Sequence, residues 1–290
     1  MSPAWPAIMA RAVENLRAHG IDDPIRDARL LLAHALDIAP DRLTLHLDDT
    51  PDAAAVDRFN DLIAQRCDRV PVSHLRGRRM FWGRDFTVSA AVLDPRPETE
   101  TLVAAALALP FTTVLDLGTG SGAILLSLLA ERVDARGTGV DLSPEALAVA
   151  RENAQTFGLD GRAKFLQSDW FAEVSGSYDL IVANPPYIAA GEMAGLAPEL
   201  AHEPRIALTD EGDGLGAYRT ITAAAPAYLN QGGWLVVEIG HRQGPAVSDL
   251  FLQAGFRGVR VIQDMDRRDR VVQGRWRARA QTGGFTRIAL

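Results

Sequence analysis

Hydrophobic and polar residues follow two different periods along this chain, and the change falls near residue 75. In residues 1–75, apolar side chains recur every three or four positions, a spacing that places them on one face of a helix. Two such faces are Ala28, Leu31, Leu32, Ala35 and Leu36, and then Ala55, Phe59, Leu62 and Ile63. Pro24, Pro40 and Pro51 stand near the expected helix starts, where the missing N–H of proline costs little. We expect residues 1–75 to form a small helical domain.

Aromatic and β-branched residues dominate positions 80–93, with Gly83 and Ser89 as turn candidates among them. Short runs of this kind, divided by turn residues, are typical of paired strands. The pattern predicts a β-hairpin linker over residues 76–95. A helix is then expected to begin at Pro97 and to end near Leu109.

From residue 96 onward, short apolar runs alternate with stretches of helical periodicity, which is typical of a doubly wound parallel sheet. Expected strands cover residues 114–117, 137–140, 163–167, 180–183, 233–239, 258–263 and 270–274, and expected helices cover 123–132, 144–158, 214–229 and 245–254. Because no helix separates the last two strands, they are predicted to form an antiparallel hairpin. The expected fold of residues 96–276 is a Rossmann-like α/β domain with an antiparallel edge strand, and residues 277–290 are expected to be a disordered tail.

Length and composition agree with this division. With 290 residues and 47% apolar content, the chain can form one Rossmann-sized domain and a smaller one, each with its own core. No apolar run approaches the ~18 residues of a membrane-spanning helix, and the N-terminus has no basic region followed by a long apolar stretch. We expect a soluble, cytoplasmic protein that contacts no membrane.

Charge and metal-binding residue types argue against several functions. The formal net charge of −7 argues against a large surface for nucleic-acid phosphates, so no direct binding to nucleic acid is expected. Cys67 is the single cysteine, and its apolar neighbours in the helical pattern indicate a core side chain. The six histidines show no metal-ligand spacing, and we expect no metal.

The first chemical motif follows the first strand of the α/β region. Gly118, Thr119, Gly120, Ser121 and Gly122 form a glycine-rich turn that leads into a helix. Glycines let the backbone approach a ligand closely, and the helix N-terminus adds free N–H groups and a positive dipole end. Phosphate loops use the same device, but the chain has no match to GxxxxGK[ST]. We predict that this turn binds a cofactor.

Two further cofactor contacts are expected at the ends of the next two strands. Asp141 stands 19 residues after Gly122, where a carboxylate can accept hydrogen bonds from both hydroxyls of a ribose. Asp169 and Trp170 follow the third strand, where Asp169 would accept from an adenine amino group and Trp170 would lie against the ring. A ribose and an adenine without a pyrophosphate site indicate S-adenosylmethionine.

The tetrapeptide Asn184-Pro185-Pro186-Tyr187 ends the fourth strand. The Asn184 side-chain oxygen and the Pro185 carbonyl can both accept from one planar –NH2 group, because proline carries no competing backbone donor. Pro186 and Tyr187 complete the expected substrate site, with Tyr187 over the flat face of the substrate group, and Asn184 is also expected to contact the cofactor. With the cofactor segments, this tetrapeptide predicts an S-adenosylmethionine-dependent methyltransferase that acts on nitrogen.

Beyond these motifs, the chain resembles the release-factor glutamine methyltransferases, the PrmC or HemK family. The resemblance covers residues 70–275 closely and the helical domain loosely. It rests on PRPETE at 95–100, DLGTGSGAI at 116–124, DLSPEAL at 141–147, SDWF at 168–171, HEPRIAL at 202–208, DGL at 213–215 and YR at 218–219. It departs at Asp94, where an apolar residue is expected, and the tail from Arg277 has no counterpart.

The resemblance implies a substrate, which is the glutamine of the Gly-Gly-Gln motif in bacterial peptide chain release factors. The methyl group would come from S-adenosylmethionine, and residues 1–75 would recruit the release factor. We expect a monomer. The sequence leaves open which release factor is preferred and whether Arg96, Glu98 and His202 touch the substrate.

Two other functions remain open at this point. A nucleic-acid N-methyltransferase, acting on adenine in DNA or guanine in rRNA, could hold a flipped base with the same tetrapeptide. It would need a basic recognition surface, which this acidic chain does not show. A cofactor-binding module without catalysis is the second alternative, and intact Asp141 and Asn184 argue against it.

Overall fold

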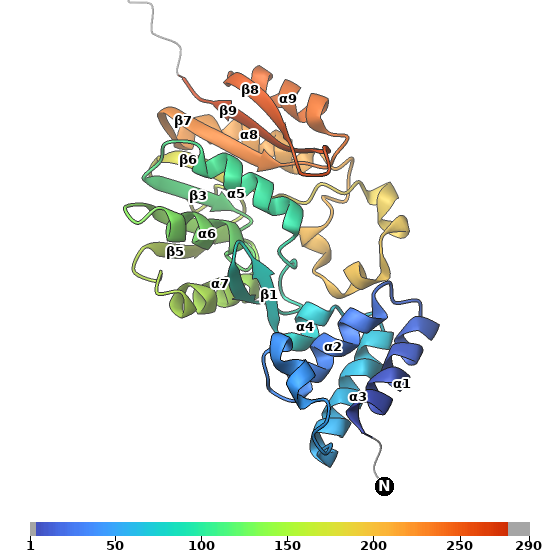
Figure 1. Cartoon of the computed structure of the whole chain (residues 1–290). Coiled ribbons are helices and arrows are strands. Elements are labelled where there is room, and N and C mark those ends of the chain that lie inside the picture. The colour runs from blue at the N-terminus through green and yellow to red at the C-terminus, as the bar shows by residue number, and fades with distance from the viewer. Residues whose placement is uncertain (1–3, 278–290) are drawn as a thin grey trace, which may run out of the picture. The chain divides into compact units, whose positions relative to one another are not determined.

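The computed structural model describes residues 4–277 and divides them into two compact units (Figure 1). The first unit contains residues 4–95 together with Gly191–Leu208, and the second contains Arg96–Ala190 and residues 209–277. Except for Arg277, the expected tail 277–290 lies outside the described residues. Within the described range, no helix combines the length and the apolar content that a membrane crossing requires.

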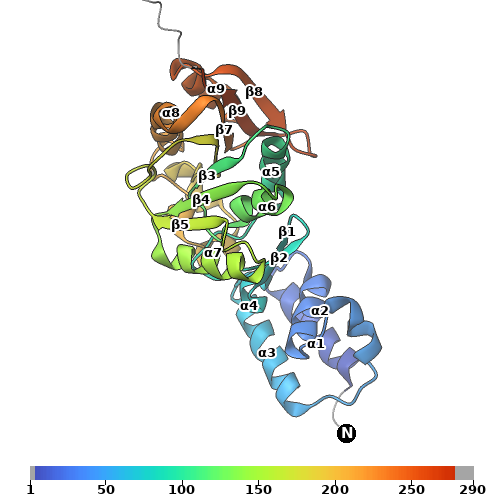
Figure 2. The same cartoon turned by 90° about the vertical axis from the view of Figure 1, so that its left-hand side faces the viewer.

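The N-terminal part of the first unit is helical (Figure 2). Its core contains Leu16, Leu31 and Phe59, each fully buried, so the apolar faces read from the sequence do face inward. Asp23 and Asp52 cap the helices that follow them. Each carboxylate accepts a hydrogen bond from the backbone N–H three residues later. The helices are α1 (Trp5–Ala18), α2 (Pro24–Ala35), the 3₁₀ helix η1 (Pro40–His46), α3 (Ala53–Cys67) and α4 (Val72–Arg76).

The expected hairpin is present but shorter than the sequence indicated. Strands β1 (Arg78–Phe81) and β2 (Arg84–Thr87) pair antiparallel around Trp82 and Gly83, which both have positive φ. This is the backbone that a two-residue hairpin turn requires. The strand pairing ends at Thr87, within the residues 80–93 whose pattern predicted the hairpin. Past Thr87 the chain turns, with the Val92 N–H bonded to the Ser89 carbonyl 3.1 Å away, and the β-branched residues there are buried without strand pairing.

Asp94, the departure from the family pattern, is a buried carboxylate. Its side chain accepts a hydrogen bond from the Ser73 hydroxyl, and His74 Nε2 lies 3.9 Å from its second oxygen. The polar partners come from the short helix α4, so a local hydrogen bond replaces the apolar packing expected at this position.

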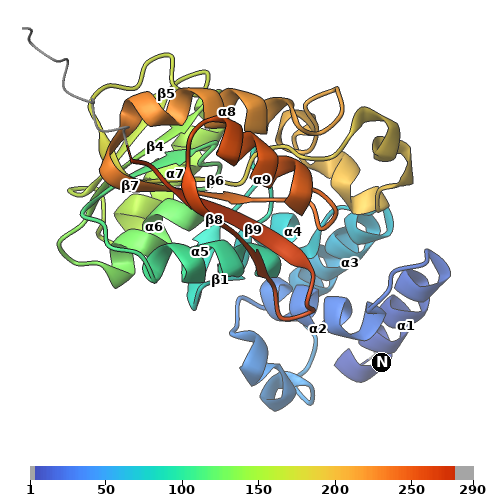
Figure 3. The same cartoon turned by 90° about the horizontal axis from the view of Figure 1, so that it is seen from above.

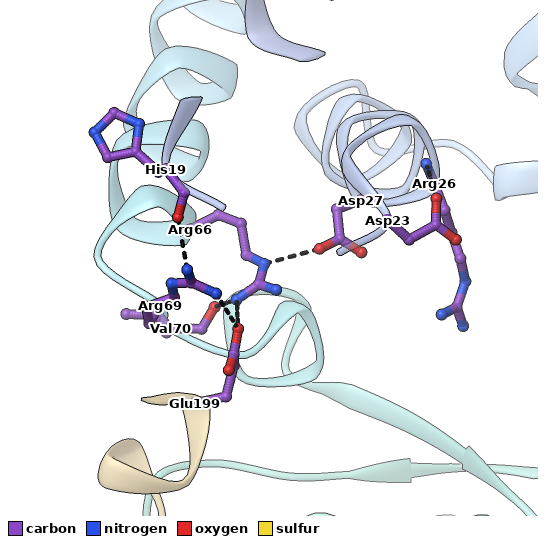
Figure 4. Close-up of polar contacts among 8 residues, drawn as sticks. All are labelled: His19, Asp23, Arg26, Asp27, Arg66, Arg69, Val70 and Glu199. Atoms are coloured by element: carbon purple, nitrogen blue, oxygen red, sulfur yellow. Dashed lines mark hydrogen bonds and ion pairs between the residues drawn. The ribbon is translucent and has the colours of Figure 1, made fainter. Parts of the chain in front are cut away.

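The segment Gly191–Leu208 belongs to the first unit, although the sequence places it within the α/β domain. It contains the 3₁₀ helices η3 (Ala190–Gly195), η4 (Pro198–His202) and η5 (Arg205–Ala207). Glu199 accepts from Arg66 at 3.1 Å and from Arg69 at 3.2 Å, and the Arg66 guanidinium also donates to Asp27 (Figure 4). The Arg66 side chain is only 9% exposed, so its ion pairs are partly shielded from water, and the pair with Glu199 anchors the segment to the helices.

The second unit is built on a seven-stranded sheet whose order is β5-β4-β3-β6-β7-β9-β8. The first five strands in this order are parallel, which confirms the doubly wound α/β fold expected from the sequence. The antiparallel hairpin forms one edge, where β9 lies beside β7 and β8 is outermost. The strands are β3 (Thr113–Leu117), β4 (Arg136–Asp141), β5 (Ala163–Gln167), β6 (Tyr178–Ala183), β7 (Leu229–Glu238), β8 (Arg257–Gln263) and β9 (Asp269–Arg275).

Helices cover both faces of this sheet (Figure 3). Helices α5 and α6 lie on one face, and α8 and α9 lie on the other. Ser143 caps α7 by accepting from the Ala146 N–H, and Pro144 occupies the first helical turn, as the sequence predicted. The helices are η2 (Pro97–Thr99), α5 (Glu100–Leu107), α6 (Ala123–Glu131), α7 (Pro144–Thr156), α8 (Gly216–Tyr228) and α9 (Gly244–Gln253).

Candidate functional site

All the predicted site segments follow the carboxyl ends of neighbouring parallel strands. Strand β3 pairs with β4 on one side, where Leu117 faces Val140, and with β6 on the other, where Leu117 faces Ala183. The chain runs from β3 through β4 and β5 and then returns to β6 on the opposite side of β3. Ligands of doubly wound sheets bind at such a reversal of strand order. The topology therefore brings the glycine turn and the NPPY tetrapeptide to neighbouring strand ends.

The glycine turn has a backbone that requires glycine. Gly118, Gly120 and Gly122 have φ values of 69°, 55° and 79°, a region that other residues enter only with strain. A Cβ atom on Gly118 or Gly120 would meet no protein atom within 4 Å. These two residues therefore face open space, and a ligand can approach their backbone closely.

Asp116, at the end of β3, supports the turn from beneath. It is fully buried, and its Oδ2 accepts from the Thr119 hydroxyl at 2.7 Å. Burial raises the pKa of Asp116 to about 7, against the lowering effect of the hydrogen bond from Thr119. Thr119 is also buried, so its side chain shapes the turn from inside.

Asp141 joins the glycine turn to the start of α7. Its Oδ2 accepts from the Gly120 N–H at 2.9 Å, and its Oδ1 accepts from the Ser143 N–H at 3.0 Å. A carboxylate oxygen has two acceptor positions, so each oxygen keeps capacity for a further donor. The side chain is half-buried, and it can therefore meet ribose hydroxyls while holding the loop.

The segment after β5 is a tight turn organised by Ser168. Its buried hydroxyl donates to the Trp170 carbonyl at 3.0 Å and accepts from the Glu173 N–H at 3.0 Å. Trp170 has a positive φ of 50° and packs partly against the sheet core, whereas Asp169 is exposed. The Asp169 carboxylate, which is expected to accept from adenine, is therefore accessible. Part of the Trp170 side chain packs against the core of the second unit.

The amide group of Asn184 is oriented by a buried threonine. Asn184 Nδ2 donates to Thr99 Oγ1 at 3.3 Å, and Thr99 is only 3% exposed. Because the nitrogen of the amide is used toward Thr99, its Oδ1 faces away as an acceptor. Pro185 is buried beside it, and the other two residues of the tetrapeptide are half-buried.

A glutamine that sequence reasoning missed braces the tetrapeptide from the other end. Gln243 Nε2 donates to the Tyr187 carbonyl at 3.0 Å and to the Gly214 carbonyl at 3.1 Å. Its Oε1 accepts from the Gly240 N–H at 2.9 Å. A Cβ on Gly214 would lie 2.4 Å from the Tyr187 carbonyl oxygen, so only glycine allows this close packing.

Glu238 is a second residue that the sequence did not single out. It ends β7, the strand beside β6, and only 1% of it is exposed. Burial raises the pKa of Glu238 to about 7, although a hydrogen bond from Thr99 and the charge of Arg270 favour the ionised form. A carboxylate that closes an otherwise apolar strand is the signal that could have identified it.

The three residues with undecided roles separate in the structure. Arg96 and Glu98 act electrostatically on both Tyr187 and Glu238, so they lie near the tetrapeptide. His202 belongs to the first unit, where its Nε2 lies 3.0 Å from the Asp68 carbonyl oxygen. Burial raises the pKa of Tyr187 to about 12, which keeps its phenol neutral. Among residues 4–277, no three His, Cys, Asp or Glu side chains cluster as a metal site would require.

Two family models match the sequence. The model described as the PrmC N-terminal domain matches residues 7–77, and the model described as the methyltransferase small domain matches residues 89–215. The first model covers most of α1 and all of α2, α3 and α4. The second model contains the glycine turn, Asp141 and the NPPY tetrapeptide.

Several curated relatives cover nearly the whole chain. A protein of Cereibacter sphaeroides named release factor glutamine methyltransferase is 57% identical over 267 residues, which are 91% of this chain and 95% of the relative. A protein of the same name from Caulobacter vibrioides is 44% identical over 277 residues, which are 93% of this chain and 94% of the relative.

Solved structures share the fold. A methyltransferase from Pyrococcus furiosus superposes with a TM-score of 0.51 at 16% identity, over 67% of this chain and 89% of that one. The hMettl16 catalytic domain, solved with the MAT2A 3′UTR hairpin 6, gives 0.56 at 14% identity, over 81% and 96% of the two chains. At such identities the likeness concerns the fold alone, and it confirms the methyltransferase-like α/β architecture.

Proposed function

The chain belongs to the release factor glutamine methyltransferase family, and we propose that it methylates the glutamine of the Gly-Gly-Gln motif in bacterial peptide chain release factors. The product is N5-methylglutamine, and S-adenosylmethionine is the methyl donor. The observation that carries this proposal is the Asn184 amide, whose nitrogen is bonded to Thr99 and whose oxygen remains available as an acceptor.

S-adenosylmethionine supplies a methyl group bonded to a positively charged sulfur. The residues at the strand ends fit its polar parts. Gly118 and Gly120 face open space, Asp141 retains acceptor capacity for ribose hydroxyls, and exposed Asp169 is available to an adenine amino group. Trp170 would lie against the adenine ring, and the proposed transfer requires no metal.

An amide nitrogen is a poor nucleophile because its lone pair is delocalised into the carbonyl. Asn184 Oδ1 and the Pro185 carbonyl accept the two N–H bonds of the substrate amide and turn its face toward the methyl group. Tyr187 covers the flat side of the amide. These fixed acceptors provide orientation and electrostatic stabilisation of the positive charge that develops on the nitrogen.

The transfer forms one bond as it breaks another. The cofactor would supply the methyl carbon: the glutamine nitrogen would bond to that carbon as the carbon–sulfur bond breaks, and neutral S-adenosylhomocysteine would leave. The nitrogen then loses one of its two protons. Asn184 and Pro185 hold both N–H bonds until that step, so no strong base is needed before attack.

The helical domain, residues 1–75, recruits the body of the release factor in this proposal. The match of residues 7–77 to the PrmC N-terminal model supports a role specific to this family. We further propose that the protein acts as a monomer in the cytoplasm, where release factors work. Sedimentation at micromolar concentration tests the monomer.

The base-flipping alternative is less supported. A nucleic-acid methyltransferase requires a basic recognition surface, whereas the formal net charge here is −7. The relatives that cover nine-tenths of the chain carry the release factor name.

A methyl-transfer assay tests the proposal directly. Labelled S-adenosylmethionine is incubated with the protein and a purified release factor, with a release factor whose Gly-Gly-Gln glutamine is replaced by alanine, and with DNA and rRNA. We expect label only in the first reaction. Label in nucleic acid, or equal label in the glutamine-free protein, would replace the glutamine proposal with the base-flipping one.

A further inference from the structure

We propose that Thr99 and Glu238 are positioning residues that set which end of the Asn184 amide faces the substrate, and that they do so only while Glu238 is ionised. This role in catalysis rests on the proposed function, glutamine methylation at Asn184. Neither residue touches the methyl group or the glutamine in this proposal. Their effect passes through Asn184.

Hydrogen bonds link three side chains, of which Asn184 directly follows β6, Thr99 ends η2 and Glu238 ends β7. Asn184 Nδ2 donates to Thr99 Oγ1, and the Thr99 side chain is bonded to the Glu238 carboxyl group. Thr99 is 3% exposed and Glu238 is 1% exposed, so water does not compete for these bonds. Tyr218 fixes the end of β7 by donating its hydroxyl proton to the Glu238 carbonyl at 2.8 Å.

A threonine hydroxyl has a single proton, and this property gives the chain its direction. An ionised carboxylate can only accept hydrogen bonds, so it takes the proton of Thr99. Thr99 then has only lone pairs left for Asn184, and the NH2 end of the amide must face it. The Oδ1 end consequently faces the substrate, as an acceptor for the glutamine amide.

A protonated Glu238 removes this constraint. A carboxylic acid can donate to Thr99, and Thr99 can then donate to Asn184 Oδ1. The two amide orientations have almost the same shape, so the tetrapeptide accommodates the reversed one without a change in packing. In that orientation Asn184 presents N–H groups to the N–H groups of the substrate amide, and the acceptor is lost.

Several charged or titratable groups surround Glu238. Arg270 from β9 and Arg96 from the segment before α5 favour its ionised form, while Glu98 opposes it. Arg270 is itself paired with Asp264 at 3.2 Å. Tyr187 and Tyr218 face the same carboxyl group, and burial raises the pKa of both phenols, so they stay neutral. Glu238 Oε2 has no hydrogen-bond partner among the described residues.

These opposing effects place the ionisation of Glu238 near neutral pH. Because burial raises the pKa of Glu238 to about 7, the group is protonated below that pH and ionised above it. The correctly oriented Asn184 therefore gains population as pH rises through about 7. Below it, kcat falls by up to about tenfold per pH unit, since one proton controls the orientation.

The test compares kcat and KM for a release factor, from pH 5.5 to 8.5, in the wild type and four variants. Thr99→Val removes the relay, and we expect kcat to fall ~10²-fold, the usual effect of losing one oriented acceptor. Thr99→Ser keeps the hydroxyl, and we expect it to restore most of kcat and the wild-type pH profile.

Glu238→Gln tests the control by charge. We expect its kcat to be lower than that of the wild type at pH 8 and to lose the pH dependence near 7. Thr222→Val is the matched control, because Thr222 is as buried as Thr99 but donates only to the backbone of its own helix. We expect its pH profile to equal that of the wild type. Calorimetry should give an unchanged Kd for S-adenosylmethionine in Thr99→Val and Glu238→Gln.

Nuclear magnetic resonance provides a readout that needs no turnover. The side-chain ¹H–¹⁵N signals of Asn184 should shift with the same midpoint as the carboxyl carbon of Glu238, and both shifts should be absent in Glu238→Gln. A wild-type pH profile in Glu238→Gln, or full kcat in Thr99→Val, would overturn the inference. Signals that move together in a protein that methylates no release factor would support this inference and overturn the proposed substrate.

Discussion

The Asn184 side chain, which we propose accepts from the substrate amide, donates one N–H of its own amide to the buried Thr99 hydroxyl. Three residues later, the Tyr187 carbonyl accepts a hydrogen bond from the half-buried Gln243. An amide that is already held by one hydrogen bond loses less entropy when substrate arrives. Because folding has already oriented the acceptor, substrate binding does not have to supply that entropy. A weak acceptor can then stabilise the transition state strongly.

Replacing Asn184 by alanine should therefore lower kcat by ~10²–10³-fold, because one oriented acceptor is lost. Most of the affinity for S-adenosylmethionine should remain, since Asp141 and the glycine turn are unchanged. Single-turnover rates and a calorimetric titration measure the two quantities. Wild-type turnover in this variant would remove Asn184 from the mechanism.

Asp141→Ala should weaken cofactor binding by ~1.5–3 kcal/mol, the range for hydrogen bonds to a charged group. The structure adds a second effect, because the same carboxylate accepts from the Gly120 and Ser143 N–H groups. We expect the Tm to fall as well. Asp141→Asn is the matched variant, which keeps the shape and loses the charge. Unchanged affinity by calorimetry in both variants would show that Asp141 does not hold the ribose.

At the scale of the elements, a substitution in the glycine turn can be compared with one at a glycine elsewhere. The comparison separates the effect of backbone strain from the effect of lost ligand contact. Gly120 and Gly158 both have positive φ, and a Cβ on either would meet no protein atom within 4 Å. Gly120 lies in the predicted cofactor turn, whereas Gly158 follows α7. Alanine at either position is strained to a similar degree, by about 1 kcal/mol.

We expect Gly120→Ala and Gly158→Ala to lose similar amounts of stability in urea unfolding. Only Gly120→Ala should lose affinity for S-adenosylmethionine, because its new methyl group would occupy space that the cofactor uses. Equal cofactor affinities for the two variants would mean that the turn does not contact the cofactor.

At the scale of the whole molecule, the segment Gly191–Leu208 leaves the second unit after Ala190 and joins the first unit through Glu199. Three residues, 188–190, separate the end of the NPPY tetrapeptide from this segment. A protein that lacks residues 1–75 thus loses more than a docking surface. It also loses Arg66 and Arg69, the partners of Glu199.

A shortened protein that begins at Arg76 should still bind S-adenosylmethionine, and it should methylate a release factor far more slowly, because remote binding energy that orients the glutamine is lost. Full-length Glu199→Gln is the control, since it weakens only the anchor. If Glu199→Gln is as slow as the shortened protein, the helices act through the segment and not by recruiting the substrate.

Local patterns in the sequence were enough to predict the architecture. Strand runs such as 163–167 and the cap at Ser143 depend on neighbours within a few residues, and the structure confirms both. The same holds for the hairpin turn at Gly83, whose positive φ is a local requirement. The sequence pattern did not show where the hairpin strands end, because Val88 and Val92 are buried by tertiary packing beyond the last strand residue, Thr87.

The order of the strands in the sheet determines which distant residues contact the site, and local sequence patterns do not show this. Sequence alone predicted the glycine turn, Asp141 and Asn184 as candidate site residues, because special backbone geometry and strand ends leave local signals. Thr99 and Gln243 carried no such signal, and the signal of Glu238 was limited to a carboxylate at the end of an apolar strand. They meet Asn184 and Tyr187 only because β6 lies between β3 and β7. A buried polar side chain takes its partner from the fold, and that choice depends on residues more than fifty positions away.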